Sequence, residues 1–263
     1  MKKILISSGS SFIAKNIREQ LKYNFTAPLH LGLDLLDPKA VNKFFKNKYF
    51  DVVIHTAGVG GRGNKTDGED VFYQNVCMFE NIIQNEEHFG KLINMGSGAE
   101  YGKQLPIVNV KETFERIPTD FYGMAKQVIG MVIERTKKDM VNLRTMAAWG
   151  KYEKPDRFIS TILSDPEELY IHDCLFNYCY VDDLVKIIDW FINNDSEYRT
   201  YNIGGTKIRL TDIAKKLKKP YILGDPGNEY TCDDTRLREE LKFKFSNFDK
   251  CLKKYQSQFL VQA

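Results

Sequence analysis

Three residues of this chain, Ser97, Tyr122 and Lys126, have the types and spacing needed to protonate a carbonyl oxygen. Tyr122 and Lys126 are four residues apart, so on a helix they lie on the same face. There the ammonium group favours the ionised phenol, which makes the phenol a usable proton donor or acceptor near neutral pH. Ser97 follows the apolar segment 91–95, a predicted strand, and its hydroxyl can hydrogen-bond the same oxygen from the other side. A Tyr and a Lys at this spacing also occur by chance, so the interpretation depends on the surrounding sequence.

The surrounding sequence strengthens the assignment. Ser97 lies four residues before Tyr101-Gly102, and Tyr122 follows Ser97 by 122 − 97 = 25 residues. This pattern resembles the extended short-chain dehydrogenases/reductases that act on nucleotide sugars, the NAD-dependent epimerase/dehydratase family. Within it, the chain is most similar to the GDP-L-fucose synthase-like 4-keto-sugar reductases. The segments that carry the likeness are 33–41, 55–61 and 73–83 and, more weakly, 180–184, 201–204 and 234–237.

The resemblance implies an α/β fold, a Rossmann-type doubly wound parallel sheet with a small C-terminal substrate-binding lobe. Short apolar segments that alternate with amphipathic ones agree with this fold. Strands are expected at residues 3–6, 27–31, 51–58, 91–95 and 141–144, and helices at 12–21, 38–47, 70–87, 120–137 and 207–219. Residues 177–195 are expected to return to the main sheet and its flanking helix. The NAD(P)-binding domain is expected at 1–175 with a return segment at 177–204, and the lobe at 151–176 and 205–263.

The turn after the first strand is where a dinucleotide places its phosphates, on the N–H groups of a helix start. The glycines that the family carries here are replaced by Ser8, Ser11 and Ala14, and Gly9 is displaced by one position. Small side chains still permit close approach, and the hydroxyls of Ser10 and Ser11 can bind phosphate. The resemblance assigns cofactor binding to Gly9, Ser10, Ser11, Phe12, Ile13, Asp34, Leu35, Ala57, Gly58, Asn75, Tyr122 and Lys126.

The sequence does not select between NADPH and NADH. An acidic residue at the end of the second strand binds the ribose of NAD, and a nearby Arg binds the extra phosphate of NADP. Residues 29–32 contain neither. NADPH is expected because biosynthetic reductions commonly use it, and NADH stays open. Asp34 can equally be a turn residue and Asn75 a polar residue on a helix face, and His55 is interpreted as a packed core residue.

The resemblance implies that the chain reduces the C4 ketone of a nucleotide-linked 4-keto-6-deoxy sugar, a hexose or a heptose. Tyr122 would donate the proton, Lys126 would position the nicotinamide ribose and Ser97 would orient the carbonyl. Substrate binding is assigned to Ser97, Gly98, Ala99 and Arg157. The family's diphosphate-binding Arg aligns with Phe176, so Arg157, Arg236 and Arg238 are the candidates for phosphate binding.

The same alignment argues against epimerase activity. Fucose synthase-like enzymes epimerise with a Cys two residues after the Ser and with a His, and these positions hold Ala99 and Arg157. A methyl cannot exchange a proton, and a guanidinium is a very poor base. Dehydration is disfavoured too, because Gly98-Ala99 follows Ser97 where dehydratases carry Asp-Glu. Two alternatives stay open: a nucleotide-sugar 4-epimerase with retained NAD, and a non-catalytic dinucleotide-sensing module.

Composition gives weaker constraints. The chain has 38 basic and 35 acidic residues, a net charge of +3, which gives no case for a nucleic-acid or membrane partner. Its five cysteines contain no CxxC pair and are expected to be free thiols in a reducing, cytoplasmic compartment. No uninterrupted apolar segment is long enough to span a bilayer, and no metal site is expected. The resemblance implies a homodimer formed through a four-helix bundle.

Overall fold

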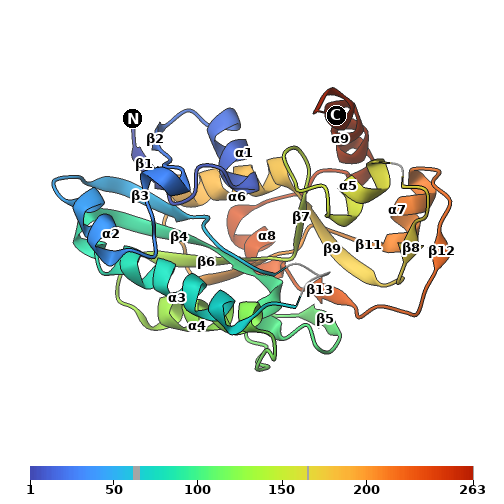
Figure 1. Cartoon of the computed structure of the whole chain (residues 1–263), viewed down its shortest axis with the longest axis horizontal. Helices are drawn as coiled ribbons and strands as arrows, with labels where there is room; N and C mark the ends of the chain where they lie inside the picture. Colours follow the sequence, from blue (N-terminus) through green and yellow to red (C-terminus); the bar gives the residue numbers. More distant parts are fainter. Residues whose placement is uncertain (62–65, 165, 263) are drawn as a thin grey trace.

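The computed structural model describes residues 1–61, 66–164 and 166–262, and its centre is a six-stranded parallel sheet (Figure 1). The strand order is β10-β6-β4-β3-β1-β2. Their bounds are β1 Lys3–Ile6, β2 Asn24–Thr26, β3 Phe50–His55, β4 Phe89–Ser97, β6 Met140–Thr145 and β10 Thr200–Ile203. The apolar runs that predicted strands are buried from both sides, as parallel sheets require. The expected α/β fold with a doubly wound parallel sheet is confirmed.

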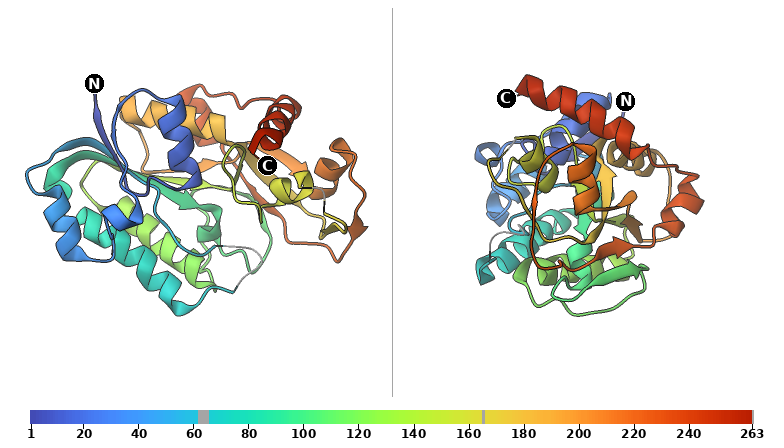
Figure 2. Two further views of the ribbon diagram at one scale, coloured as in Figure 1. Left: turned by 45° about the horizontal axis from the view of Figure 1, so that its top comes forward. Right: turned by 90° about the vertical axis from the view of Figure 1, so that its right-hand side faces the viewer.

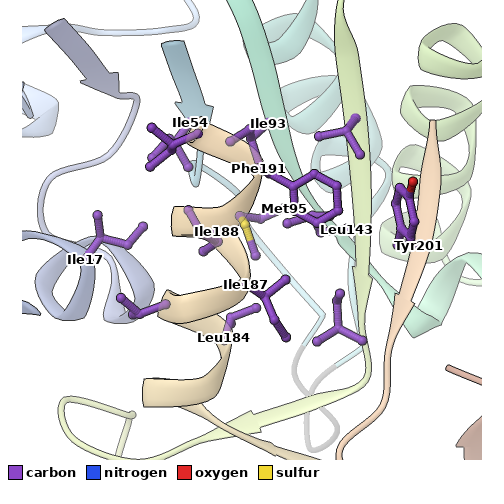
Figure 3. Close-up of a cluster of buried hydrophobic side chains, with 14 of the residues drawn as sticks. Ile17, Ile54, Ile93, Met95, Leu143, Leu184, Ile187, Ile188, Phe191 and Tyr201 are labelled. Carbon is purple, nitrogen blue, oxygen red and sulfur yellow. The ribbon is translucent and has the colours of Figure 1, made fainter. Parts of the chain in front are cut away.

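Helices cover both faces of this sheet (Figures 1 and 2). One face carries α1 (Phe12–Gln20) and α6 (Val181–Asn193), and the other carries α2 (Pro38–Phe45), α3 (Glu69–Ile83) and α4 (Phe121–Arg135). In Figure 3, apolar side chains of α6 such as Ile188 and Phe191 lie against Ile93 and Leu143 of the sheet. Each helix therefore buries one apolar stripe, which fixes the sheet between two hydrophobic layers.

The chain order reverses next to β1: β2 lies on one side of it and β3 on the other. In open parallel sheets, ligands bind beyond the carboxyl ends of the strands at such a switch point. The carboxyl ends of β1, β3 and β4 come together at this edge, so the residues that follow these strands are placed at one site.

A second, five-stranded sheet lies beside the first, to the right in Figure 1. It contains β11 (Thr206–Arg209), β9 (Leu175–Tyr180), β13 (Tyr230–Cys232) and β5 (Ile107–Val110), and β7 (Ala147–Trp149) pairs with β9. A two-stranded sheet joins β8 (Tyr170–Ile171) to β12 (Ile222–Leu223). The α-helices in this part are α5 (Phe158–Leu163), α7 (Leu210–Lys216) and α9 (Phe248–Gln262). Helix α8 (Thr235–Leu241) instead packs by β10, with Leu237 in the core of the main sheet. Short 3₁₀ helices lie at η1 (His30–Gly32), η2 (Glu86–His88) and η3 (Gly98–Tyr101).

Three expectations about elements need correction. The second strand is at Asn24–Thr26 rather than 27–31, where η1 begins instead. The segment 177–180 belongs to β9 and pairs with β11 in the second sheet, so only α6 and β10 return to the main sheet. The predicted helix 207–219 begins as β11 because residues 206–209 pair with β9, and α7 starts only at Leu210.

The second sheet also takes strands from the region that the sequence assigned to cofactor binding, namely β5 and β7. The membership of β5 and β7 in the second sheet depends on pairing with strands far away in the chain, so no local pattern reveals it. The division into an NAD(P)-binding part and a substrate lobe stays a prediction. Across the described ranges, no helix is both long and apolar enough to pass through a membrane.

Candidate active site

Ser97 is the last residue of β4 and the N-cap of η3. Its hydroxyl oxygen accepts a hydrogen bond from the Ala99 N–H at 3.1 Å, and its own N–H donates to Glu100 Oε1 at 2.9 Å. These reciprocal bonds form a capping box, in which a Glu or Gln lies three residues after the Ser. The backbone around Ser97 is therefore fixed on both sides of the strand end.

Glu100 is buried, and its carboxylate is the centre of a polar network behind Ser97. It accepts hydrogen bonds from Asn142 Nδ2 at 3.0 Å and from Arg144 Nε at 2.7 Å. Arg144 also donates to the Tyr101 hydroxyl at 3.1 Å, and that hydroxyl donates to Asn202 Oδ1 at 2.6 Å. Sequence reasoning missed Glu100, although the Ser-x-x-Glu spacing was a visible signal for the capping box.

Tyr122 and Lys126 lie in the first half of α4, as expected from their spacing. Asp120 caps this helix by accepting from the Gly123 N–H at 2.9 Å. Lys126 is buried, and its ammonium donates to the Met95 carbonyl at 3.0 Å and lies 5.8 Å from the centre of the Tyr122 ring. The helix start thus holds both side chains against the end of β4.

The electrostatics of the pair differ from expectation. Burial raises the pKa of Tyr122 above its usual value, a hydrogen bond with Ser97 opposes the rise, and the Glu100 charge adds to it. Burial also lowers the pKa of Lys126 to about 8, against the attraction of Glu100. Burial is the largest cause of the shift at Tyr122, so in the chain alone its pKa lies above the usual value rather than near neutrality. The expected effect of Lys126 on the phenol stays a prediction. At neutral pH the phenol is protonated and can donate.

Two further residues of the site come from outside the main sheet. Arg157 is the N-cap of α5, and its charge favours ionisation of both Tyr122 and Tyr230. Its guanidinium also donates to the Ala148 carbonyl at 3.1 Å. A Cβ atom at Gly98 would lie only 2.5 Å from the Tyr230 hydroxyl, so this phenol covers the backbone next to Ser97. No sequence pattern pointed to Tyr230.

The other arginines expected as phosphate ligands have protein partners. Arg236 donates to the Thr200 carbonyl at 2.7 Å and lies over the ring of Tyr198. Arg238 pairs with Asp234 at 2.6 Å within α8. Phe176 packs against the Tyr230 ring, with ring centres 5.3 Å apart. Of the three arginines, Arg157 is the one that lies by the two phenols.

The phosphate turn is built differently from the expectation for Ser11. Its hydroxyl caps α1 by accepting from the Ala14 N–H at 3.2 Å and donates to the Ser8 carbonyl at 3.1 Å. Gly9 is required by close packing, because a Cβ there would lie 2.3 Å from the Ala27 carbonyl oxygen. Ser10 is exposed. A phosphate at this turn would therefore meet backbone N–H groups and Ser10 rather than the Ser11 hydroxyl.

Phe12 and Ile13, the first residues of α1, are half-buried, and their side chains pack against the core of the α6 face. They hold the start of α1 against the sheet. Their own N–H groups belong to the first turn of the helix, where intrahelical acceptors are lacking.

The end of β3 is joined to β1 by a buried serine. The Ser7 hydroxyl oxygen accepts from the N–H groups of Thr56 and Ala57 at 3.0 Å each, and it lies 3.0 Å from His55 Nδ1. Burial lowers the pKa of His55 to about 3, so its ring is neutral over the physiological range. The interpretation of His55 as a core residue is confirmed.

Asn75 is buried in α3 and holds the loop after β3. Its amide accepts from the Val59 N–H at 3.2 Å and donates to the carbonyls of Val59 at 2.9 Å and Val71 at 2.7 Å. A Cβ at Gly58 would lie 3.2 Å from its Oδ1. The side chain of Asn75 is thus buried and fixes the loop after β3, and its place beside the nicotinamide stays a prediction.

Asp34 and Leu35 follow η1. Asp34 is exposed, and its carboxylate accepts from the Leu36 N–H at 2.9 Å, which makes it a turn residue. Leu35 is buried in the core on the α3 side, and its carbonyl accepts from Asn81 at 2.8 Å. Contact of Asp34 and Leu35 with the adenine stays a prediction, and the Asp34 carboxylate is accessible for it.

Ala57 and Gly58 follow the end of β3; Ala57 is buried and Gly58 is exposed. A Cβ at Gly58 would lie 3.7 Å from Lys126 Nζ, so the backbone of Gly58 passes close to the ammonium. The Lys126 ammonium carries three N–H donors. The Met95 carbonyl accepts from one of these N–H groups, so the others are available to donate to ribose hydroxyls.

Only part of the loop 58–68, which was expected near the sugar, can be placed, since residues 62–65 lie outside the described residues. At its described start, a Cβ at Gly61 would lie 2.7 Å from the Tyr122 ring. Within the described ranges, no three His, Cys, Asp or Glu side chains gather as a metal site would require. The five cysteines are free, four of them buried and Cys77 exposed.

Comparison with known families agrees with this geometry. The profile of the NAD dependent epimerase/dehydratase family matches residues 5–204, which include the phosphate turn, Ser97, Tyr122 and Lys126. The match ends before β13, so Tyr230 lies outside it.

Individual relatives are distant. GDP-L-colitose synthase of Yersinia pseudotuberculosis is 25% identical over 258 residues, 86% of this chain and 83% of that protein. Probable UDP-arabinose 4-epimerase 3 of Oryza sativa subsp. japonica is 30% identical over 73% of this chain, which spans about half of that protein, 48%. A GDP-mannoheptose C4 reductase from Campylobacter jejuni with NADP bound superimposes with a TM-score of 0.86 at 18% identity, covering 99% of this chain and 98% of the other. This last likeness concerns the fold.

Proposed function

The chain belongs to the NAD dependent epimerase/dehydratase family and is an oxidoreductase, and we propose that it reduces the C4 ketone of a GDP-linked 4-keto-6-deoxy sugar. The observation that carries the proposal is the convergence of Ser97, Tyr122 and Lys126 at the carboxyl end of β4. Relatives that act on GDP-linked sugars, such as the colitose synthase and the heptose reductase, support the substrate class. Both a hexose and a heptose fit this class.

Each of the three residues has a separate task. The Ser97 hydroxyl orients the ketone by donating to its oxygen. Tyr122 gives its proton to that oxygen as negative charge develops there, and its raised pKa keeps the proton in place until then. Lys126, whose ammonium lies 5.8 Å from the centre of the Tyr122 ring, donates to the nicotinamide ribose. The bound nicotinamide supplies hydride to the carbon.

We assign NADPH as the reductant. The NADP-bound heptose reductase of similar fold supports this choice. Backbone N–H groups of Phe12 and Ile13 and the Ser10 hydroxyl would hold the pyrophosphate, and Ala57 and Gly58 would let the dinucleotide cross the end of β3.

We further propose that the enzyme reduces without epimerising. Ala99 is buried beside Ser97 and has no titratable group, and Arg157 offers a permanent charge that can bind phosphate or orient the sugar. A 4-epimerase that retains NAD uses the same three residues, and the similarity to the arabinose epimerase keeps it as the second candidate.

One experiment separates the candidates. Purified protein is incubated with NADPH and GDP-linked 4-keto-6-deoxymannose, and NADPH absorbance is followed together with the sugar product by NMR. The reductase consumes NADPH in a one-to-one ratio with ketone. A parallel incubation contains NAD and a GDP- or UDP-hexose, and if the protein interconverts this sugar with its 4-epimer without net production of NADH, the second candidate is correct. Binding of NADPH without any turnover would favour a dinucleotide sensor.

We also propose a homodimer in which α3 and α4 of one chain pack against those of a second. Apolar side chains on these helices stay exposed in the single chain, including Tyr73 at 63%, Met131 at 46% and Val132 at 39% exposure. Two such helix pairs would form a four-helix bundle and bury this surface.

A further inference from the structure

Arg18 lies in the second turn of α1, and its side chain runs back toward the start of that helix. Its guanidinium Nη1 donates to the Gly9 carbonyl at 3.3 Å, nine residues earlier in the chain. Helical side chains lean toward the N-terminus of their helix, so this direction is an ordinary one for a long residue. The positive charge of Arg18 therefore lies at the turn between β1 and α1.

The same turn touches the segment that follows β2. The Gly9 N–H donates to the Pro28 carbonyl at 2.9 Å, and a Cβ at Gly9 would lie 2.3 Å from the Ala27 carbonyl oxygen. Gly9 thus contacts the chain beyond β2 with its N–H and its Cα, and it contacts Arg18 with its carbonyl. A single residue joins the guanidinium to the end of the second strand.

This junction is where the adenosine part of a dinucleotide is expected. In folds of this type the pyrophosphate lies on the turn after the first strand, and the adenosine ribose lies at the end of the second. The extra phosphate of NADPH is attached to the 2′-oxygen of that ribose. The segment 27–32 contains no Arg or Lys for it, and His30 is its one basic residue. Positive charge reaches this point from α1 instead.

The guanidinium of Arg18 has donors to spare. It carries five N–H groups in a planar fork that matches the oxygens of a phosphate. Among the residues that the structure describes, the Gly9 carbonyl is its one hydrogen-bond acceptor, and no carboxylate pairs with it. The neighbouring Glu19 binds Lys151 and Tyr152 instead. Arg18 is exposed, so a ligand can reach its uncompensated charge.

We propose that Arg18 selects NADPH over NADH by binding the 2′-phosphate of the adenosine ribose. Nη1 keeps its bond to the Gly9 carbonyl, and the remaining N–H groups donate to the phosphate. The bond to Gly9 already orders the long side chain at the turn, which lowers the entropy cost of binding. This inference rests on the assignment of NADPH in the proposed function.

The first measurement compares NADPH with NADH, which differ only in the 2′-phosphate. Dissociation constants are obtained from nicotinamide fluorescence, without sugar substrate. Arg18→Ala should weaken NADPH about 10- to 100-fold, the equivalent of a charge-assisted hydrogen bond or two, and should change NADH less than about threefold. Arg18→Lys keeps the charge without the fork and should lie between the two.

Lys15→Ala is the matched control. It removes one positive charge from the same exposed helix, but the Lys15 ammonium lies over the Tyr152 ring, 5.5 Å from its centre. The ratio of the two dissociation constants should stay at its native value in this variant. An equal loss of preference in Lys15→Ala and Arg18→Ala would mean that only the net charge matters, and it would overturn the proposal.

Three other outcomes would also count against Arg18. If it only held the turn through Gly9, Arg18→Ala would weaken NADPH and NADH together. If the preference were lost in His30→Gln and kept in Arg18→Ala, the phosphate would bind at His30. A native protein that prefers NADH would refute the assignment of NADPH itself, whereas a native preference that survives in Arg18→Ala refutes only the role of Arg18.

The second measurement uses the reductase assay with varied NADPH. Arg18 binds the end of the cofactor that does not react, so Arg18→Ala should raise the KM for NADPH about 10- to 100-fold and leave kcat within about twofold of the native value. Adenosine 2′,5′-bisphosphate should inhibit the native protein more strongly than 5′-AMP does, and Arg18→Ala should remove this difference. A fall in kcat with an unchanged KM would contradict the proposal.

Discussion

Among single residues, Tyr122 is the one on which proton transfer depends. Its pKa is raised mainly by burial, so the phenol is protonated throughout the neutral range. Tyr122→Phe removes the proton donor and keeps the ring, and turnover should fall about 10²- to 10⁴-fold while NADPH still binds. Stopped-flow reduction and nicotinamide fluorescence measure the two properties. Normal turnover in this variant with a true substrate would refute the assignment.

Lys126 should give cofactor binding a pH limit. Its pKa is lowered to about 8, mainly by burial, so the ammonium is present below pH 8 and lost above it. The dissociation constant of NADPH should therefore rise as the pH increases through about 8. Lys126→Met should bind more weakly at pH 7 and lose most of this pH dependence. A dissociation constant that stays flat from pH 7 to 9.5 in the native protein would contradict the role of Lys126.

The lowered pKa of Lys126 also predicts that replacing this residue stabilises the folded protein while it weakens cofactor binding. Between pH 8 and 10.5 the unfolded chain binds more protons at Lys126 than the folded chain does, so this residue makes stability rise with pH in that window. Lys126→Met removes a buried charge with little loss of volume. Its Tm at pH 7 should exceed that of the native protein, and this can be measured by calorimetry. A Tm that falls would mean that the buried ammonium stabilises the fold.

The side chains of Ala99 and Arg157 predict that the carbons flanking the reduced carbon keep their hydrogens during the reaction. When the reaction is run in D₂O with NADPH, the carbons flanking the reduced carbon should carry no deuterium, because neither residue can remove a proton from them. Product NMR gives the answer. Deuterium at those carbons would show exchange or epimerisation and would end the proposal of a simple reductase.

At the scale of elements, the junction of β4 and η3 depends on one buried carboxylate. Glu100 binds Ser97, Asn142 and Arg144 at once, so removing its charge leaves a buried guanidinium without its partner. Glu100→Gln should lower the free energy of unfolding by about 3 kcal/mol. It should also reduce kcat, since the amide of Gln offers one acceptor oxygen in place of two, and the hydrogen bonds from Ser97, Asn142 and Arg144 cannot all remain. Glu87→Gln, on the exposed Glu87–His88 pair, should change stability by less than about 0.5 kcal/mol. Urea denaturation of both variants measures this, and equal effects would argue against the network.

At the scale of the whole molecule, the exposed apolar stripe on α3 and α4 should determine the oligomeric state. Met131→Glu with Val132→Glu would place two charges in the proposed four-helix bundle, and the variant should sediment as a monomer while the native chain sediments as a dimer. Ile222→Glu with Leu223→Glu, two exposed apolar residues of β12, is the control because it adds the same two charges elsewhere. A native protein that is monomeric at micromolar concentration would refute the dimer.

Much of the core region follows from local sequence. Apolar runs and helical periodicity located β1, β3, β4, β6 and the helices α1 to α4, because each of these elements buries its own apolar residues against the parallel sheet. The spacing of Ser97, Tyr122 and Lys126 was sufficient to recognise the family, since that chemistry requires a strand end and a helix face at a fixed separation. The weak second strand was misplaced because its short pairing with β1 leaves little apolar signal.

Only the tertiary structure decided the rest of the site. Tyr230 is more than 100 residues from Ser97 in the sequence and reaches it because β13 pairs with β5 and β9, which no local pattern encodes. The protonation of Tyr122 and Lys126 was likewise not contained in the sequence, because it depends on how far the fold removes each group from water. Residue types and spacing along the chain defined the possible chemistry. Pairing between distant strands and the burial that follows from it determine which groups meet the substrate and which of them carry a proton.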